Sequence, residues 1–230
     1  MTITTQSLIR WSGPAVIIAG LSYALVGVFH PPNIVASVTT PLWMVVHVLA
    51  MATSIFGLVG LSGLYARQAE KTGWLGLAGY VLLSLWLALI LGFTFVEVFI
   101  LPPLATAAPA FVAGWLGMFN GTSSTLDLGS LPTVWTITGP LYILGGLLFG
   151  IATFRARILP RWAGVLLAVG AAMGPVAALL PLDLQPKVAV PVGFALIWLG
   201  YSLWSERRTK SVALATHAAD VSGLTPAPAV

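Results

Sequence analysis

The residues of this chain that could carry out chemistry are a few ionisable side chains set within or beside long apolar stretches. At helical rise His47 lies about 9 Å beyond Pro41, inside the apolar run that begins there. Glu97 lies near the end of the next run. An unpaired ionisable group in hydrocarbon costs at least about 3 kcal/mol, so such residues usually have a partner or a function. If His47 and Glu97 face each other they could exchange a proton with a bound molecule, and we take both as candidate catalytic residues.

Plainer explanations exist for these and for the other ionisable residues. A histidine in an apolar helix often serves only as an interhelical hydrogen-bonding group, and a carboxylate at a helix end can simply face water. We assign His30 and Asp183 as substrate-binding residues because they close the first and fifth apolar runs, although both could be ordinary interface residues. Asp127 lies among Ser, Thr and Gly and is expected to be a turn residue.

Two stripes of aromatic and hydroxyl-bearing residues extend the candidate site. One stripe shares the helical face of Glu97, and the other lies in the run 133–154. The predicted substrate-binding residues on them are Trp86, Thr94, Trp135, Thr138 and Tyr142. With His47 they predict an aromatic-walled pocket, although stripes of this kind are also common in simple helix packing.

Several chemistries are open to such a pocket, and several are excluded. The chain has no cysteine, so disulfides, thiolate nucleophiles and iron–sulfur clusters are ruled out. No two of His30, His47, Glu97 and Asp183 have the spacing of neighbouring ligands on one helix, so we assign no metal ligands, and a metal held by all four is a weak alternative. No cofactor is assigned. One acid in an aromatic pocket could protonate an apolar polyene, as in a membrane terpene cyclase, but no motif of that group is present.

The elements that position these residues are membrane-spanning helices. Hydrophobic residues make up 58% of the chain and charged residues only 7%, which is too little polar surface for a soluble globule. A barrel is not expected, because the apolar runs lack strict alternation. Six runs are long enough to cross a bilayer. They cover Trp11–His30, Pro41–Tyr65, Trp74–Ile100, Thr133–Phe154, Trp162–Pro181 and Val188–Trp204.

Basic residues predict the orientation of these six spans. Nine of the ten Lys and Arg residues fall on one side if six spans are correct, and Lys187 is the exception. We therefore predict an all-α bundle in the plasma membrane with both termini in the cytoplasm. His30, His47, Glu97 and Asp183 then lie in the outer half. The net charge of +4 reflects topology, and no nucleic-acid partner is expected.

A short repeat divides the spans into three hairpins. Trp11-Ser12-Gly13, Trp74-Leu75-Gly76 and Trp162-Ala163-Gly164 each open an odd-numbered span. The alternative explanation is that tryptophans collect at any membrane interface. The fifth and sixth spans are expected to be kinked or broken at their prolines, which are Pro175, Pro181, Pro186 and Pro191.

We expect one transmembrane domain over residues 1–205, followed by a flexible cytoplasmic tail over 206–230. The connection 101–132 is unusually long and is a candidate lid, with a short helix predicted over Pro109–Phe119. A helix that merely lies on the membrane is the alternative.

The segment LVGLSGLYARQAEKTGWLGLAGYVLL, with His-Pro-Pro after the first span, resembles small six-span bacterial membrane proteins whose activity is not characterised. The resemblance implies a fold and a bacterial plasma membrane, and no functional residue is transferred from it.

The sequence is compatible with three classes of function. The first is an outward-facing pocket that binds a small apolar or amphiphilic molecule and acts on it as an acid–base enzyme, of cyclase or isomerase type. The second is a small proton-coupled permease. The third is an accessory subunit whose Gly-rich faces bind a membrane partner or a second copy of the chain.

Overall fold

The computed structural model describes residues 4–123 and 125–205, and these form helices with no strand among them. The all-α class is therefore confirmed. The predicted tail over 206–230, with Arg207, Arg208 and Lys210, lies outside the described residues, as does the side chain of Arg10. The helices are α1 Thr5–Phe29, α2 Val35–Val38, α3 Pro41–Phe95, the π-helix η1 Val96–Ile100, α4 Leu101–Ala107, α5 Pro109–Asn120, α6 Leu131–Ala156, α7 Arg161–Ala172, α8 Gly174–Ala177, the 3₁₀-helix η2 Gln185–Ala189, and a C-terminal helix over 190–205.

Length and composition make this a membrane protein. Four continuous helical stretches are long and apolar enough to cross a bilayer. They are Ser7–Phe29, Pro41–Ala107, Leu131–Ala156 and Gln185–Ser205. Helix α7 is apolar but shorter, because the helix ends at Ala172, just before Met173 and Pro175. This agrees with the break predicted from the prolines.

The longest stretch is a hairpin of two helices that turns at Gly73. Gly73 has φ 54° and ψ −150°, a conformation that is open to glycine and interrupts α3. On either side, Tyr65 stacks on Tyr80 with ring centroids 4.8 Å apart, and the Trp43 indole reaches the Glu97 carbonyl. The pair that lies farther from Gly73 along one arm also lies farther along the other, so the two arms, residues 41–72 and 73–95, run antiparallel.

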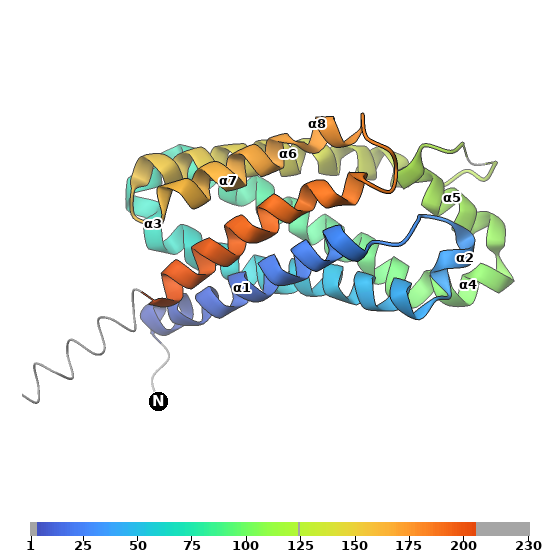
Figure 1. The fold of residues 1–230 in the computed structure, drawn as a ribbon, viewed down its shortest axis with the longest axis horizontal. Helices are drawn as coiled ribbons and strands as arrows, with labels where there is room; N and C mark the ends of the chain where they lie inside the picture. The colour runs from blue at the N-terminus through green and yellow to red at the C-terminus, as the bar shows by residue number, and fades with distance from the viewer. Residues whose placement is uncertain (1–3, 124, 206–230) are drawn as a thin grey trace, which may run out of the picture.

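Six helical segments form a closed ring in which each neighbour runs antiparallel to the next (Figure 1). Helix α1 packs on the first arm of α3, the second arm packs on α6, and α6 packs on α7. Gly170 of α7 meets Val192 of the C-terminal helix, which returns to α1. Short connections between successive helices favour this up-and-down order.

Glycines set the spacing of the ring. A Cβ on Gly20 would lie 2.6 Å from the Gly193 carbonyl oxygen, and one on Gly193 would lie 2.7 Å from that of Gly20. Gly150 and Gly164 oppose each other in the same way between α6 and α7. Such contacts let helix backbones approach closely, which is the main source of helix association in a membrane.

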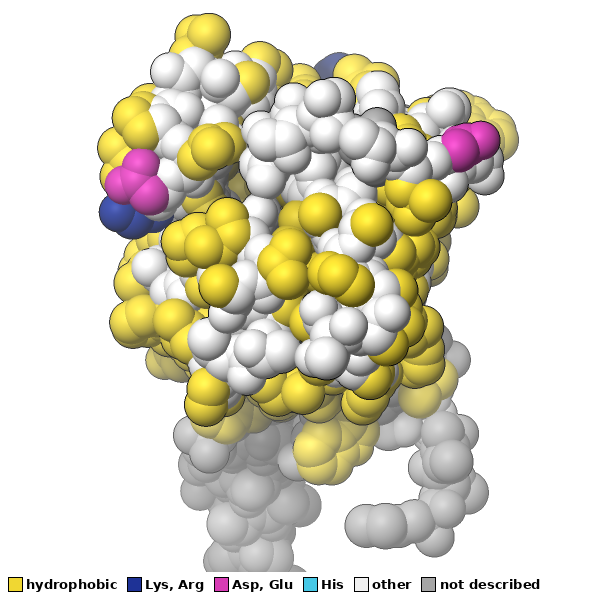
Figure 2. Space-filling view, turned by 90° about the vertical axis from the view of Figure 1, so that its right-hand side faces the viewer, with side chains coloured by type: hydrophobic (Ala, Val, Ile, Leu, Met, Phe, Trp, Pro, Cys, Tyr) yellow, Lys and Arg dark blue, Asp and Glu magenta, His cyan; other side chains and the backbone are white. Residues whose placement is uncertain are grey.

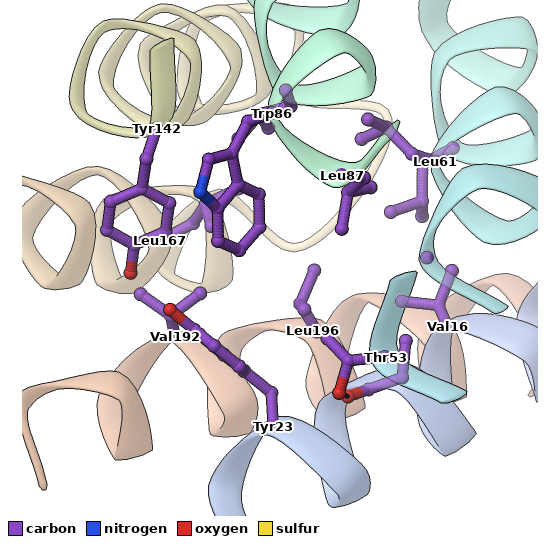
Figure 3. Close-up of a pocket in the computed structure, with 14 residues that line it drawn as sticks. Val16, Tyr23, Thr53, Leu61, Trp86, Leu87, Tyr142, Leu167, Val192 and Leu196 are labelled. Atoms are coloured by element: carbon purple, nitrogen blue, oxygen red, sulfur yellow. Dashed lines mark hydrogen bonds between the residues drawn. The ribbon is translucent and has the colours of Figure 1, made fainter. Parts of the chain in front are cut away.

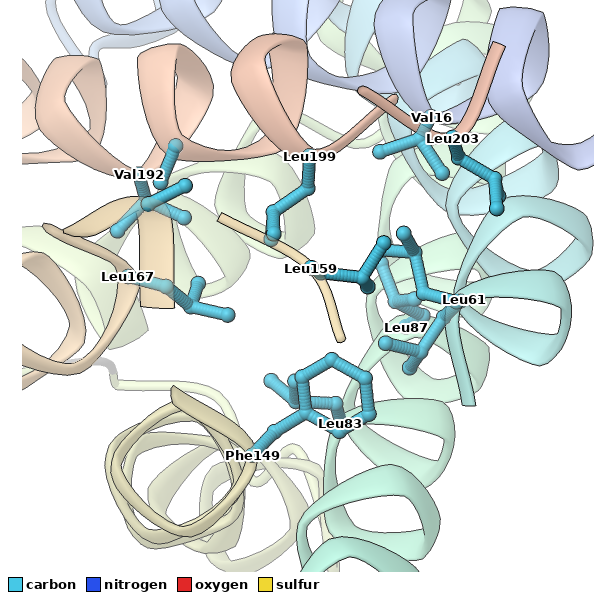
Figure 4. Packing of buried hydrophobic residues seen from close by; sticks show 13 residues of the cluster. Val16, Leu61, Leu83, Leu87, Phe149, Leu159, Leu167, Val192, Leu199 and Leu203 are labelled. Carbon is cyan, nitrogen blue, oxygen red and sulfur yellow. The ribbon is translucent and has the colours of Figure 1, made fainter. Parts of the chain in front are cut away.

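Side chains from all six segments fill the interior of the ring (Figure 4). Phe149, Leu64 and Leu199 are fully buried there. Residues that face outward are large and apolar, as expected of helices surrounded by lipid, and they include Ile18, Val59, Leu85, Leu144 and Phe194.

The two ends of the ring differ. One end, here called the Gly73 end, holds the turn of α3 and the α6–α7 connection. Helices α2, α4 and α5 cover the other, here called the α5 end (Figure 1). Helix α5 occupies the place of the short helix predicted over Pro109–Phe119, and its side chains Val112, Trp115 and Leu116 are buried. Figure 2 looks onto the α5 end and shows no histidine on that face.

Candidate functional site

The two predicted catalytic residues meet beneath the covering helices at the α5 end. His47 Nε2 lies 3.6 Å from Glu97 Oε2. His47 comes from the first arm of α3 and Glu97 from η1, which continues the second arm, and the two residues are nearly equally far along the chain from Gly73. His47 and Glu97 are both buried, with 2% and 6% of their surface exposed.

One ring nitrogen of His47 is already occupied. Nδ1 lies 2.8 Å from the carbonyl oxygen of Trp43, and because a carbonyl only accepts, Nδ1 must carry the hydrogen and donate it. In the neutral ring Nε2 is then an acceptor directed at Glu97. A pair that carries one proton is either a protonated acid beside a neutral ring or a carboxylate beside an imidazolium.

Trp43 fixes this pair, although it was not predicted as a site residue. Its ring stacks on His47 with centroids 3.9 Å apart, and its indole N–H donates to the Glu97 carbonyl over 2.9 Å. It sits one helical turn before His47 on the same face, and this spacing is the signal in the sequence that could have identified it.

Glu97 lies in a π-helix, the five-residue segment η1 Val96–Ile100. A π-helix shifts the following residues around the helix axis and frees a backbone carbonyl, and such bulges are frequent at functional sites. Here the Glu97 carbonyl accepts from Trp43. The bulge thus explains how one residue supplies both a backbone acceptor and a buried carboxyl group.

His30 is the third ionisable residue of the cluster. Its ring centroid lies 5.3 Å from that of His47 and 6.5 Å from that of Trp43. Nδ1 donates to the Pro31 carbonyl over 2.7 Å. Burial lowers the pKa of His30 below its ordinary value, and the Pro31 hydrogen bond opposes this only in part. A neutral ring with Nε2 free to accept is therefore favoured.

The predicted substrate-binding residues are divided between separate places. Trp135 lies beneath α5, where it contacts Phe93 and Phe119 with centroid distances of 5.4 Å and 4.4 Å. Thr94 and Thr138 are buried, but each hydroxyl donates to a carbonyl of its own helix, that of Ile90 or that of Trp135. These two hydroxyls are therefore not free to bind a ligand as they stand.

Asp183 and Asp127 lie apart from the cluster. Asp183 is exposed in the connection between α8 and η2. The Asp127 carboxylate accepts from the backbone N–H of Gly129 over 2.8 Å, which confirms it as a turn residue.

Trp86 and Tyr142 line a cavity in the middle of the ring rather than at the α5 end (Figure 3). Their ring centroids are 4.7 Å apart, and Tyr23 of α1 meets both. The hydroxyl groups of Tyr23 and Tyr142 point toward each other. Each of the six ring segments contributes to the lining, but the volume is only about 40 Å³ and the walls are almost wholly apolar.

A cavity of about 10–15 Å³ holds one water molecule, so this central cavity of about 40 Å³ has room for a few water molecules and is too small for an organic ligand. The predicted polar pocket and the cavity are therefore different places. The polar groups converge at the α5 end, where no group of three His, Cys, Asp or Glu side chains among the described residues is arranged to hold a metal ion.

No protein-family model, curated protein or solved structure matches the chain.

Proposed function

We propose that this protein is a six-span plasma-membrane protein that binds a small amphiphilic molecule beneath α5 and exchanges a proton with it through His47 and Glu97. It acts as an acid–base enzyme on that molecule. The observation that carries the proposal is the buried approach of His47 Nε2 to Glu97 Oε2 at 3.6 Å, with Nδ1 already committed to a backbone carbonyl.

The distribution of charge supports the topology. Among the basic residues whose side chains are described, Lys187 alone is near the α5 end, and the others gather at the Gly73 end. Those others are Arg67, Lys71, Arg155, Arg157 and Arg161. Lys and Arg concentrate on the cytoplasmic side of membrane proteins, so the Gly73 end is the cytoplasmic end and both chain termini lie there.

Exposed tryptophans support the same arrangement. Trp11, Trp74 and Trp162 each lie near the start of a helical segment at the Gly73 end, and all three are exposed. The glycine two residues after the first and third of them packs against a neighbouring helix, Gly13 on Gly200 and Gly164 on Gly150. Positions two apart lie on opposite helical faces, so each repeat puts an indole at the membrane interface and a glycine in a helix contact.

The spacing within the His47–Glu97 pair favours proton exchange over a purely structural ion pair. A separation of 3.6 Å is longer than a hydrogen bond, so the shared proton has no short path between the two side chains. A ligand oxygen to the side of the pair, about 2.8 Å from each atom, would lie within hydrogen-bond reach of both. General acid–base catalysis requires this geometry, a donor and an acceptor within reach of one reacting group.

Because the His47–Glu97 pair is buried, a ligand can reach it only if a covering element moves. The pair is covered by α5, and α5 is joined to α6 by a turn-rich connection that begins at Gly121. One side-chain hydrogen bond, from Asn120 to the Asn33 carbonyl over 3.0 Å, holds the end of α5 to the α1–α2 connection. Apolar and aromatic contacts hold the rest of α5 to the described residues, and we propose that this helix moves as the lid.

The test is to identify the molecule that co-purifies with the protein in mild detergent, by mass spectrometry of an organic extract. We expect one species with wild-type protein and with Asp183→Asn, which removes an exposed acid outside the cluster. Loss of charge-assisted hydrogen bonds costs about 1.5–3 kcal/mol, so Glu97→Gln and His47→Ala should retain about ten- to a hundredfold less of it.

Equal amounts of the same species in folded Glu97→Gln would contradict the proposal, as would the absence of any bound species from wild-type protein. Proton-driven accumulation of the molecule in liposomes, with the molecule chemically unchanged, would replace the enzyme by a permease.

A further inference from the structure

The indole N–H of Trp115 is a buried donor without a partner among the described residues. Trp115 is only 2% exposed. A buried tryptophan usually finds an acceptor for its N–H, because an unpaired buried donor has lost its hydrogen bonds to water without replacement. Trp43, the other indole of the site, donates to the Glu97 carbonyl. Trp115 is thus the one of the two whose donor is unused.

Aromatic neighbours hold this donor in place on the underside of α5. Phe93, Phe111 and Phe119 surround the Trp115 ring, with centroids 5.5 Å, 6.2 Å and 6.4 Å away. The indole nitrogen lies beside the Glu97 carboxyl group without completing a hydrogen bond to it. The lid therefore presents one fixed N–H toward the Glu97 side of the His47–Glu97 pair.

These groups define what a ligand must offer. The site has two donors, the Trp115 N–H and the one proton of the pair when it is on Glu97, and one acceptor, His47 Nε2. A hydroxyl oxygen accepts two hydrogen bonds and donates one, so it satisfies all three groups. A ketone or an ether only accepts and leaves His47 Nε2 unpaired, and an ammonium group has no lone pair for the Trp115 N–H.

We propose that Trp115 is a positioning residue that selects a hydroxyl-bearing apolar molecule and holds its oxygen beside the His47–Glu97 pair, within hydrogen-bond reach of both side chains. This inference rests on the proposed function, since it names the ligand class of the same site. It also gives α5 a direct role, because closing the lid brings the third hydrogen-bonding group to the ligand.

The experiment uses photoreactive probes on the purified full-length protein in detergent. The probes are a long-chain alcohol that carries a diazirine in its chain, its methyl ether and the ketone of the same length. We expect the alcohol to label peptides from α5 and η1, and the ether and ketone to label them weakly. Trp115→Phe keeps an aromatic ring and removes the N–H, so alcohol labelling should fall about five- to tenfold. The ether also accepts from this N–H but is held more weakly, so its labelling should fall less.

Trp162→Phe is the matched control, because it removes an indole N–H that is exposed at the Gly73 end, away from the site. It should label like wild-type protein. Should Trp115→Phe fail to fold, benzothienylalanine at position 115 retains the shape of the indole and replaces the N–H by sulfur, and the same loss of alcohol labelling is expected.

The outcomes separate the two proposals. If Trp115→Phe lowers labelling by all three probes equally, or if wild-type protein does not distinguish alcohol from ether, Trp115 is a packing residue and the inference is overturned. Loss of alcohol labelling in Glu97→Gln without an effect of Trp115→Phe overturns the role of Trp115 and leaves the proposed function intact. Alcohol labelling that Glu97→Gln does not reduce contradicts the proposed function itself.

Discussion

Glycines make many of the close helix contacts at the Gly73 end, where Tyr65 also stacks on Tyr80, whereas stacked rings and buried hydrogen bonds make most of the contacts between the two arms at the α5 end. Gly60 of the first arm of α3 packs on Val16 of α1, and Gly63 packs on Ser12. At the α5 end the contact between the arms of α3 is instead made by Trp43, His47 and Glu97. Glycine contacts join backbones directly, while the aromatic and polar contacts depend on side-chain positions.

This difference indicates which end of the molecule can change shape. A helix pair in backbone contact has no side chains to rearrange, so the Gly73 end forms a fixed frame. The α5 end is built from short helices, a π-helix and side chains with several rotamers. Binding and catalysis need such adjustable parts on a rigid support, and the candidate site is found at this end.

The largest loss of stability is expected when a methyl group is added to the closely packed Gly73 end. A Cβ on Gly79 would press on the backbone nitrogen of Phe149 in α6, so Gly79→Ala should lower the free energy of unfolding by about 1–3 kcal/mol or prevent folding. Gly92→Ala in the same arm is the matched control, because a Cβ there meets nothing within 4 Å. It should be neutral or stabilise the helix by up to about 1 kcal/mol.

Thermal unfolding of both variants in one detergent checks this prediction. If the two alanines have equal effects, close backbone contact does not hold the Gly73 end together.

Much of the frame could be predicted from sequence, for a physical reason. Apolar runs report helices because a bilayer leaves no other partner for the backbone, and the predicted run Thr133–Phe154 differs from α6 by two residues at each end. The meeting of His47 and Glu97 follows from the same logic, since a hairpin pairs residues that are equally far from its turn. The predicted number of spans stays a prediction, because α7 is short and only four stretches reach spanning length.

The details of the site could not be predicted in this way. Nothing in the sequence of Val96–Ile100 identifies a π-helix. The Glu97 carbonyl in this segment accepts a hydrogen bond from Trp43 on the first arm of α3, and a contact between residues so far apart cannot be derived from the local sequence. The apolar composition of 109–119 predicts a helix, but not that Trp115 faces the Glu97 carboxyl group. The central cavity depends on how six segments fit together, so Tyr23 was missed although it lies on the same face of α1 as His30.

A smaller effect is expected from loosening the α5 end alone. Trp43→Phe keeps the ring but removes the hydrogen bond to the Glu97 carbonyl, which is then buried without that donor. We expect a loss of about 1–2 kcal/mol that is confined to the α5 end. Hydrogen–deuterium exchange should rise in peptides that cover η1 and α4 and stay constant in α7.

Trp162→Phe is the control for this variant, because that indole is exposed at the Gly73 end. Faster exchange spread evenly over both ends in Trp43→Phe would mean that the two regions do not unfold separately.

The smallest effect should come from the polar exception within the frame. Gln68 is buried at the Gly73 end, where its amide donates to the Thr153 hydroxyl over 2.9 Å, but its amide oxygen has no partner among the described residues. Gln68→Leu removes one hydrogen bond and also one unsatisfied acceptor, and these two terms are of similar size and opposite sign. Thr153 can then donate to a carbonyl of its own helix. Thermal unfolding should therefore place Gln68→Leu within about 1 kcal/mol of wild-type protein, whereas destabilisation as large as that of Gly79→Ala would show that the frame, like the site, depends on buried polar contacts.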